Sequence, residues 1–265
     1  MRIIVKGWKM TDKVYLITGA GSGIGAAISK RLAAKDTLLI LHTKRNDSGL
    51  DAVAQQCQAQ GAKVICHLGD LAKIETINKL CHAVKANSEH LTGLVSNAGF
   101  PDWRNFAEID SQGINDSLQV IVQASFALIQ ACTPLLLAKS PSATSAGKVI
   151  AVSSFLAHKY KVGTSYVPAS SAAKAALEAL IKSYAAQYAP KHITANIIVP
   201  GYIRKNSPDH KPLAAEAMQR IVDRIPAGRL GQPDEVADLC EFLLSDKANY
   251  ITGQCLHIDG GLLLG

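Results

Sequence analysis

Residues 166–177 read YVPASSAAKAAL and hold three side chains that could move a proton: Tyr166, Ser170 and Lys174. An ammonium close to a phenol stabilises the phenolate, and a phenol with a pKa of about 10 needs that help near neutral pH. Ser170 stands four residues before Lys174, one helical turn away, but its hydroxyl is too weak an acid to replace a phenol. Tyr166 lies eight residues before the lysine. Either Tyr166 works from a displaced position, or the site lacks its acid.

Pro168 bears on this choice. In a continuous helix, residues at i and i+8 would be about 12 Å apart and turned from each other by roughly 80°. Proline breaks a helix interior but suits the first turn. We therefore expect the helix to begin near residue 168, which leaves Tyr166 in the preceding loop, from where it could fold back over the site.

A second candidate site is the turn TGAGSGIG at residues 18–25, with glycines at 19, 21, 23 and 25. It follows the apolar run Val14–Ile17 and precedes a small-residue helical pattern. A helix N-terminus presents unpaired N–H groups that bind phosphate, and glycines allow a pyrophosphate to approach the backbone. A strand before the turn and a helix after it together predict dinucleotide binding.

The rest of the chain alternates short apolar runs with longer helical patterns. Strands are expected at 14–17, 38–41, 64–68, 94–96, 149–153, 193–199 and 255–258. Helices are expected at 24–33, 48–60, 74–84, 112–138, 169–189, 213–225 and 233–244. Residues 140–147 and 202–212 are expected to be loops. This alternation predicts α/β architecture, a single doubly wound domain with a buried parallel sheet over 11–265, preceded by an N-terminal extension at 1–10.

Composition narrows the function classes. The chain of 265 residues carries a formal net charge of +7, but its aromatic fraction is only 5% and its cations are spread out. This pattern argues against nucleic-acid binding and allows attraction to anionic small molecules or an acidic carrier protein, although a solvated basic surface alone would account for the charge. The six cysteines are scattered without a Cys-x-x-Cys pair, which favours free thiols in the cytoplasm and no metal site. The apolar runs predict no membrane span.

Several motifs in order resemble the short-chain dehydrogenase/reductase family. They are TGAGSGIG, Asn97-Ala98-Gly99, Pro200-Gly201 and the tail ITGQCLHIDGG at 251–261. Residues 225–253 look especially like its ketoacyl-carrier-protein-reductase-like branch. The resemblance implies a Rossmann-type fold, hydride transfer between a nicotinamide and a carbonyl, alcohol or enoyl substrate, and a homo-tetramer or dimer.

The resemblance also implies a set of cofactor-binding residues. NAD-preferring members carry an acidic residue at the end of the second strand, where this chain reads His42-Thr43-Lys44-Arg45. Cations there suit the 2′-phosphate of NADP, so NADP is expected, with NAD the alternative. The implied cofactor-binding residues are Gly19, Ser22, Gly23, Ile24, Gly25, Thr43, Lys44, Arg45, Asp70, Leu71, Asn97, Ala98, Gly99, Lys174, Pro200, Gly201 and Ile203.

The implied catalytic residues are Ser154, Tyr166 and Lys174. Ser154 matches the serine that orients the carbonyl, with Ser153 beside it, and Lys174 matches the lysine that binds the ribose. In enoyl reductases of the family the tyrosine-to-lysine spacing is also longer, as it would be for Tyr166. The asparagine that supports a proton relay in the family falls here on Ile121, which cannot hold water.

The substrate side is expected in a variable lid at about 202–225. Its basic and polar residues favour an anionic or carrier-bound small molecule, although a solvated loop would have the same composition. The lid residues in question are Arg204, Lys205, Asn206, His210 and Lys211. His158 and Tyr160 are further candidates for the pocket. The alternative to a reductase is a cofactor-binding protein with a regulatory or subunit role, motivated by the displaced tyrosine and the missing asparagine.

Overall fold

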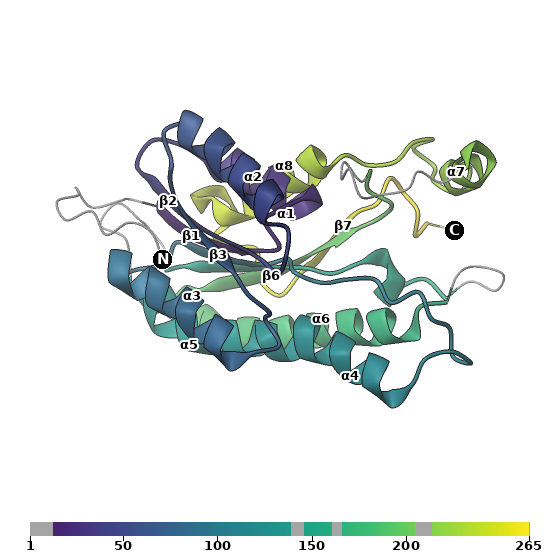
Figure 1. Ribbon diagram of the computed structural model, residues 1–265, viewed down its shortest axis with the longest axis horizontal. Helices are drawn as coiled ribbons and strands as arrows, with labels where there is room; N and C mark the ends of the chain where they lie inside the picture. Colours follow the sequence, from purple (N-terminus) through teal and green to yellow (C-terminus); the bar gives the residue numbers. More distant parts are fainter. Residues whose placement is uncertain (1–12, 139–145, 161–165, 205–213, 265) are drawn as a thin grey trace.

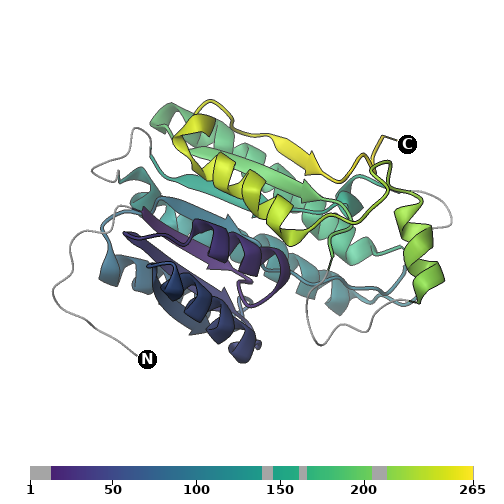
Figure 2. The same ribbon diagram turned by 90° about the horizontal axis from the view of Figure 1, so that it is seen from above.

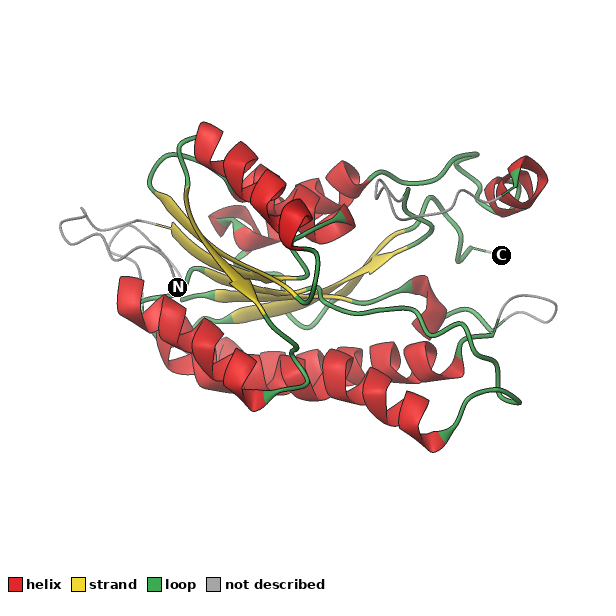
Figure 3. Ribbon diagram, viewed as in Figure 1, coloured by secondary structure: helices red, strands yellow, loops and turns green. Residues whose placement is uncertain are grey.

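The computed structural model describes residues 13–138, 146–160, 166–204 and 214–264 of the chain. In this part of the protein, seven parallel strands form one sheet between two layers of helices (Figure 1; Figure 3). The strand order is β3-β2-β1-β4-β5-β6-β7, and the fold is a single Rossmann-type α/β domain. The strands are β1 (Lys13–Thr18), β2 (Thr37–Thr43), β3 (Lys63–Leu68), β4 (Gly93–Ser96), β5 (Lys148–Val152), β6 (Thr194–Pro200) and β7 (Cys255–Ile258).

The helices follow the strands as right-handed crossovers require. The α-helices are α1 (Gly23–Leu32), α2 (Asp47–Ala59), α3 (Ile74–Asn87), α4 (Ser111–Leu118), α5 (Ala124–Leu137), α6 (Pro168–Tyr188), α7 (Ala215–Val222) and α8 (Pro233–Leu244). Shorter turns are η1 (Gln119–Gln123), η2 (Phe155–Ala157), η3 (Ala189–Lys191) and η4 (Asp246–Ala248). Figure 2 shows the layers from above, with α7 at the same end as the C-terminus.

Strand periodicity sorts the core into two layers. Val14 and Leu16 of β1 point into the cluster under α3, α5 and α6, whereas Tyr15 and Ile17 point into the cluster under α1, α2 and α8. Successive side chains of a strand alternate between faces, and both faces of this sheet are covered, so the middle of β1, Val14–Ile17, is buried on both sides. In Figure 1 the two helix layers lie above and below the sheet.

The predicted strands and helices are confirmed, with boundaries that differ by a few residues. One difference is local: the long helix expected over 112–138 contains a π-helical turn, η1, between α4 and α5. The start of α6 at Pro168 confirms the helix boundary expected from proline. The expected extension at 1–10 and most of the loops at 140–147 and 202–212 lie outside the described residues.

The helical stretch Ser111–Leu137 is long and apolar enough to cross a membrane, by length and composition alone. Here its apolar side packs onto the sheet: Leu128, Cys132 and Leu136 are fully buried in the cluster that also contains β1 and β4 side chains. The composition therefore reflects a core helix of the domain.

Candidate active site

A cavity of about 1280 Å³ lies at the carboxyl ends of the strands. It is lined by residues that follow β1, β2, β3, β4, β5 and β6, so it spans the point where the strand order reverses between β1 and β4. In open parallel sheets this crevice is where ligands bind. The volume exceeds what a typical small ligand needs, so it has room for a dinucleotide together with a substrate.

The glycine turn between β1 and α1 forms one wall. Gly23 has a φ of +55°, and a Cβ built on it would meet nothing within 4 Å, so its outer side is open. Gly25 is closed by contrast, because a Cβ there would lie 2.2 Å from the Gly19 carbonyl oxygen. Ser22, the N-cap of α1, makes no side-chain capping bond. An open backbone with uncapped N–H groups fits a pyrophosphate.

Asn97 ties this turn to β4. Its Nδ2 donates to the carbonyl oxygens of Thr18 at 3.0 Å and Gly19 at 3.2 Å. The backbone N–H groups of Asn97 and Ala98 donate in return to Thr18 Oγ1. These bonds hold the ends of β1 and β4 in a fixed relation, so the cofactor wall is set before any ligand binds.

The end of β2 carries the side chains that are expected to contact the ribose diol of NAD or the 2′-phosphate of NADP. The Lys44 ammonium lies 2.6 Å from Asp70 Oδ2, and this contact holds the pKa of the Asp70 carboxyl below its usual range. Both residues line the cavity together with Thr43. Arg45 is exposed and is not among the described residues that line it. At the end of β2, the described residues therefore present one cation to the cavity, Lys44, which is already paired with the Asp70 carboxylate.

Lys174 projects from the first turns of α6 into the cavity. Its Nζ donates to the Val152 carbonyl oxygen at 2.6 Å and would lie 3.4 Å from a Cβ placed on Gly99. Burial lowers the pKa of this ammonium to about 8, because desolvation disfavours the charged form. Ile121 of the π-helical turn is 1% exposed and would lie 3.6 Å from the same Gly99 Cβ. The side chain at the expected relay position is therefore buried hydrocarbon beside the lysine.

Ser153 and Ser154 both line the cavity but use their hydroxyls differently. Ser153 Oγ donates to Glu178 Oε1 at 2.5 Å, so in this structure its proton is hydrogen-bonded to a carboxylate and is not directed at a substrate oxygen. Ser154 Oγ accepts from the Leu156 N–H at 3.2 Å, which leaves its own proton available. A serine that orients a carbonyl must donate a hydrogen bond to it, so the hydrogen bonds of the two hydroxyls favour Ser154 over Ser153 for this role.

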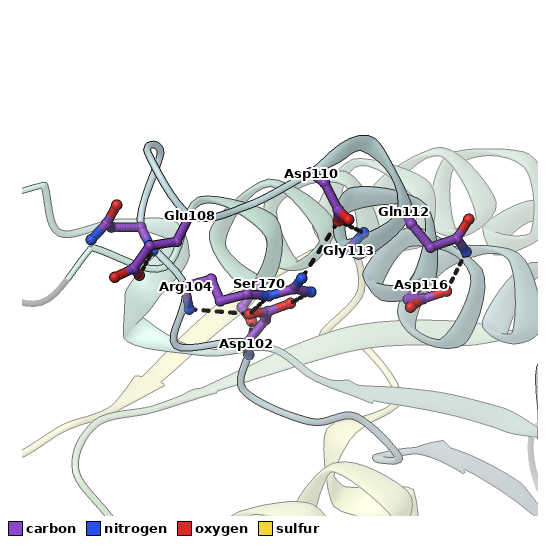
Figure 4. A network of polar contacts seen from close by, with 9 residues as sticks. Asp102, Arg104, Glu108, Asp110, Gln112, Gly113, Asp116 and Ser170 are labelled. Atoms are coloured by element: carbon purple, nitrogen blue, oxygen red, sulfur yellow. Dashed lines mark hydrogen bonds and ion pairs between the residues drawn. The ribbon is translucent and has the colours of Figure 1, made fainter.

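Ser170 occupies the position one turn before Lys174 and is 3% exposed. Its hydroxyl accepts from the Asp102 N–H at 2.9 Å (Figure 4). The Asp102 carboxylate in turn accepts hydrogen bonds from Nε and Nη2 of Arg104 at 3.0 and 2.6 Å. Ser170 thus anchors the loop after β4, whose residues Phe100 and Trp103 line the cavity.

Tyr166 lies just before α6 and is 50% exposed. It is not among the described residues that line the cavity, whereas Tyr202 is. Tyr202 packs against Phe155 with ring centroids 4.6 Å apart, and burial raises the pKa of its phenol. His158 turns away from the cavity to Glu178, and Tyr160 is 70% exposed.

The structure brings most of the residues singled out in the sequence to one cavity. Those that line it are Gly19, Ser22, Gly23, Ile24, Thr43, Lys44, Asp70, Leu71, Asn97, Ala98, Gly99, Ser154, Lys174, Pro200, Gly201 and Ile203. Gly25 supports the turn from behind, and Lys205, Asn206, His210 and Lys211 lie outside the described residues. Sequence reasoning missed the aromatic wall of Phe100, Trp103 and Phe155, although Phe100 and Trp103 follow directly on Asn97-Ala98-Gly99.

A dinucleotide-sized cavity at the switch point, with a glycine turn on one side and a partly buried lysine on the other, is the arrangement of a dinucleotide-binding protein. Over residues 19–263 the chain matches the family described as enoyl-(acyl carrier protein) reductase. It is 31% identical over 252 residues to the 3-oxoacyl-(acyl-carrier-protein) reductase FabG of Escherichia coli, an alignment covering 95% of this chain and 98% of that protein. The chain belongs to the short-chain dehydrogenase/reductase family of NAD(P)-dependent oxidoreductases.

Other relatives agree over the same length. The chain is 32% identical over 251 residues to the uncharacterized oxidoreductase YmfI of Bacillus subtilis, covering 94% of this chain and 98% of the relative. Among solved structures, a short-chain dehydrogenase from Burkholderia cenocepacia in complex with NADP superposes with a TM-score of 0.84 at 28% identity. That match covers 96% of this chain and 98% of the other.

Proposed function

We propose that this chain is an NADPH-dependent reductase of a carbonyl or enoyl group. The observation that carries the proposal is Lys174, whose ammonium lies beside Gly99 in a dinucleotide-sized cavity at the sheet's switch point. Bound NADPH would supply the hydride. A screen of carbonyl and enoyl compounds, following NADPH absorbance at 340 nm with purified protein, tests this; NADPH binding without oxidation of any compound would favour a regulatory or subunit role instead.

The chain's own residues would hold the reacting oxygen and provide its proton. Ser154, with its proton available, would donate to the substrate oxygen, and Lys174 would hold the nicotinamide ribose. Tyr166 is the proposed proton donor. It lies beside the start of α6, so its phenol would have to turn toward the cavity when both ligands are bound.

Tyr166→Phe tests this assignment, because the variant keeps the ring and removes only the hydroxyl. The expected result is a fall in kcat of about 100-fold or more, the usual scale for losing a general acid. Tyr160→Phe is the matched control, since that phenol is 70% exposed and donates to the nearby Ala157 carbonyl oxygen. Unchanged turnover in Tyr166→Phe would remove Tyr166 from the mechanism and direct attention to Tyr202, which lines the cavity.

The preference for NADP over NAD rests on the end of β2, where Thr43, Lys44 and Arg45 stand without a carboxylate. The NADP named in the Burkholderia cenocepacia structure is consistent with this assignment. Lys44→Ala should weaken NADPH binding about tenfold, the scale of one charged hydrogen bond, and leave NADH binding unchanged. Lys35→Ala, an exposed lysine before β2, is the control; equal losses for both cofactors would contradict the assignment.

The substrate proposed here is an anionic or carrier-bound small molecule with an apolar portion. Lys159, Arg204 and Arg224 line the cavity, as do the aromatic side chains of Phe100 and Trp103. The Escherichia coli relative is named for a substrate carried on acyl carrier protein.

We further propose that the chain acts in the cytoplasm, that residues 1–10 are an extension of the domain at 11–265, and that about 202–225 form its substrate lid.

A further inference from the structure

A buried carboxylate lies one helical turn beyond Lys174 and is not used by the proposed chemistry. Glu178 of α6 is 5% exposed. Its Oε1 accepts from Ser153 Oγ at 2.5 Å and from His158 Nε2 at 2.9 Å. Its Oε2 accepts from Cys255 Sγ at 3.3 Å. Burying a carboxylate is costly unless it is well hydrogen-bonded, so three donors on one carboxylate indicate a built network.

This network runs from the cavity to the protein surface. Ser153 lines the cavity at the end of β5. The His158 side chain, just after η2, is 28% exposed, and the exposed His257 ring packs edge-on against it with centroids 4.8 Å apart. Ser153 and His158 share the same oxygen of Glu178, so two successive hydrogen bonds connect the cavity with solvent.

We propose that Ser153, Glu178 and His158 form a proton path that resupplies the cavity from solvent in each catalytic cycle. This inference rests on the proposed reductase function, because each reduction consumes one proton. It also explains how a site with Ile121 beside its lysine would be reprotonated, since the buried isoleucine offers neither donor nor acceptor there.

The proton transfers balance without any other reactant. Bound NADPH would supply the hydride for the substrate carbon, and the proton donor in the cavity would give its proton to the substrate oxygen. The His158 imidazolium first gives its Nε2 proton to the Glu178 carboxylate. Glu178 then gives that proton to Ser153 Oγ as the Ser153 hydroxyl proton passes to the donor in the cavity, which leaves Glu178 a carboxylate again. His158 is then reprotonated by water, so one solvent proton ends on the product.

Other charged and titratable groups face the network and set its electrostatics. Lys174 lies on the same helix one turn earlier, and Lys182 one turn later near the Cys255 thiol. Cys255 and His257 come from β7. Cations therefore lie on both sides of Glu178 along α6.

Glu178→Gln is the first test, because it keeps the shape of the side chain but cannot carry a proton between its neighbours. In the substrate assay, kcat should fall about tenfold or more, within the range for lost proton transfer, and the solvent deuterium isotope effect on kcat should increase. The KM for NADPH should be unchanged. Cys255→Ala is the matched control, since it removes a donor to the other carboxylate oxygen and leaves the path intact.

Chemical rescue separates proton transfer from a purely structural role. His158→Ala opens a partly exposed site, and free imidazole added to this variant should restore turnover in proportion to the concentration of its protonated form. The same imidazole should not rescue Glu178→Gln, where the path is cut further inside. Rescue of neither variant, together with normal isotope effects in both, would overturn the path.

The chemical shift of the His158 Nε2–H proton, measured by NMR, tests the network without relying on substrate turnover. Ser153→Ala removes the competing donor to Glu178 Oε1, so the hydrogen bond from His158 should strengthen and its proton signal should move downfield. An unmoved signal contradicts the shared network. If the native chain turns over substrate and Glu178→Gln has the same kcat, the proton path is rejected and the proposed function stands. If the native chain oxidises no NADPH with any compound, the proposed function is rejected and the path with it.

Discussion

Lys174 combines a charged role with a desolvated position. Among the described residues, its ammonium donates to the Val152 carbonyl oxygen, in a cavity wall that also includes Gly99 and, behind it, Ile121. The carbonyl stabilises the charge less than a carboxylate would, and burial therefore lowers the lysine pKa to about 8. The contact proposed between Lys174 and the ribose would therefore lose its charge as the pH rises through about 8.

Cofactor binding should follow this titration. A lysine is charged below its pKa, so NADPH affinity should be constant below about pH 7 and should fall as the pH rises through about 8. Fluorescence titration of NADPH between pH 6 and 9.5 measures it. Lys174→Met should bind weakly without this pH dependence, while Lys182→Met, an exposed lysine of the same helix, should behave as the native chain. A native affinity that does not change between pH 7 and 9 would contradict this prediction.

Ser170 illustrates a residue whose position suggests chemistry but whose hydrogen bond indicates a structural role. It accepts from the backbone of Asp102, 68 residues away, and so fixes the loop carrying Trp103. Ser170→Ala leaves the buried Asp102 N–H without its acceptor and should destabilise the fold by about 1 to 3 kcal/mol. Urea unfolding measures this loss.

Turnover in Ser170→Ala should fall by less than about tenfold, because a serine hydroxyl is too weak an acid to supply the proton. Ser171→Ala, the next residue of α6 and also buried, controls for helix effects. A loss of 100-fold in kcat with unchanged stability would instead make the Ser170 hydroxyl part of the chemistry.

At the scale of elements, the turn between β1 and α1 contains one glycine required by packing, Gly25, and one that leaves space for a phosphate, Gly23. At Gly25 a Cβ would meet the Gly19 carbonyl oxygen at 2.2 Å, so Gly25→Ala forces backbone movement and should cost about 1 to 3 kcal/mol of stability. At Gly23 a Cβ would meet no protein atom but would project where phosphate is expected to bind. Gly23→Ala should therefore lose more NADPH affinity than stability, apart from about 1 to 2 kcal/mol for its positive φ.

Thermal unfolding and NADPH titration of the two variants measure these effects. We expect the two variants to rank in opposite order in the two measurements. Gly25→Ala should be the less stable variant, and Gly23→Ala should bind NADPH more weakly than its stability alone would explain. If both variants lost binding only in proportion to unfolding, the turn would be a structural feature and not a phosphate site.

Much of the element structure could be predicted because it depends on local pattern. Both faces of the sheet are covered, so strands read as continuous apolar runs, and Pro168 marks the start of α6. The π-helical turn at Gln119–Gln123 could not be predicted, since its residues have no distinctive helical pattern. The contacts of Ser170 with Asp102 and of Glu178 with His158 and Cys255 join distant segments, and only tertiary packing brings them together.

At the scale of the molecule, the strand order places the whole candidate site at one end of the sheet. The ends of β1, β2, β3 and β4 contribute the expected cofactor wall, and β5, β6 and α6 contribute Ser154, Ile203 and Lys174. The proposed proton path leaves on the β7 side, where Cys255 and His257 lie, away from the aromatic loop after β4.

The exposed apolar side chains bear on assembly. Phe126 on α5 is 49% exposed, although the neighbouring positions of the helix are packed into the core. The small side chains of α6 allow close helix pairing, and we expect a homo-tetramer or dimer formed through α5 and α6. Tyr250, which follows η4, is fully exposed elsewhere on the surface and serves as a matched position.

Phe126→Asp should dissociate the assembly, because it places a charge in an interface that would otherwise bury an aromatic ring. Light scattering coupled to size exclusion should give a smaller mass for this variant than for the native chain, with unchanged circular dichroism. Tyr250→Asp should keep the native mass. A native chain that is a monomer at micromolar concentration, or a Phe126→Asp variant with the native mass, would show that α5 is not the interface and that its apolar face has another role.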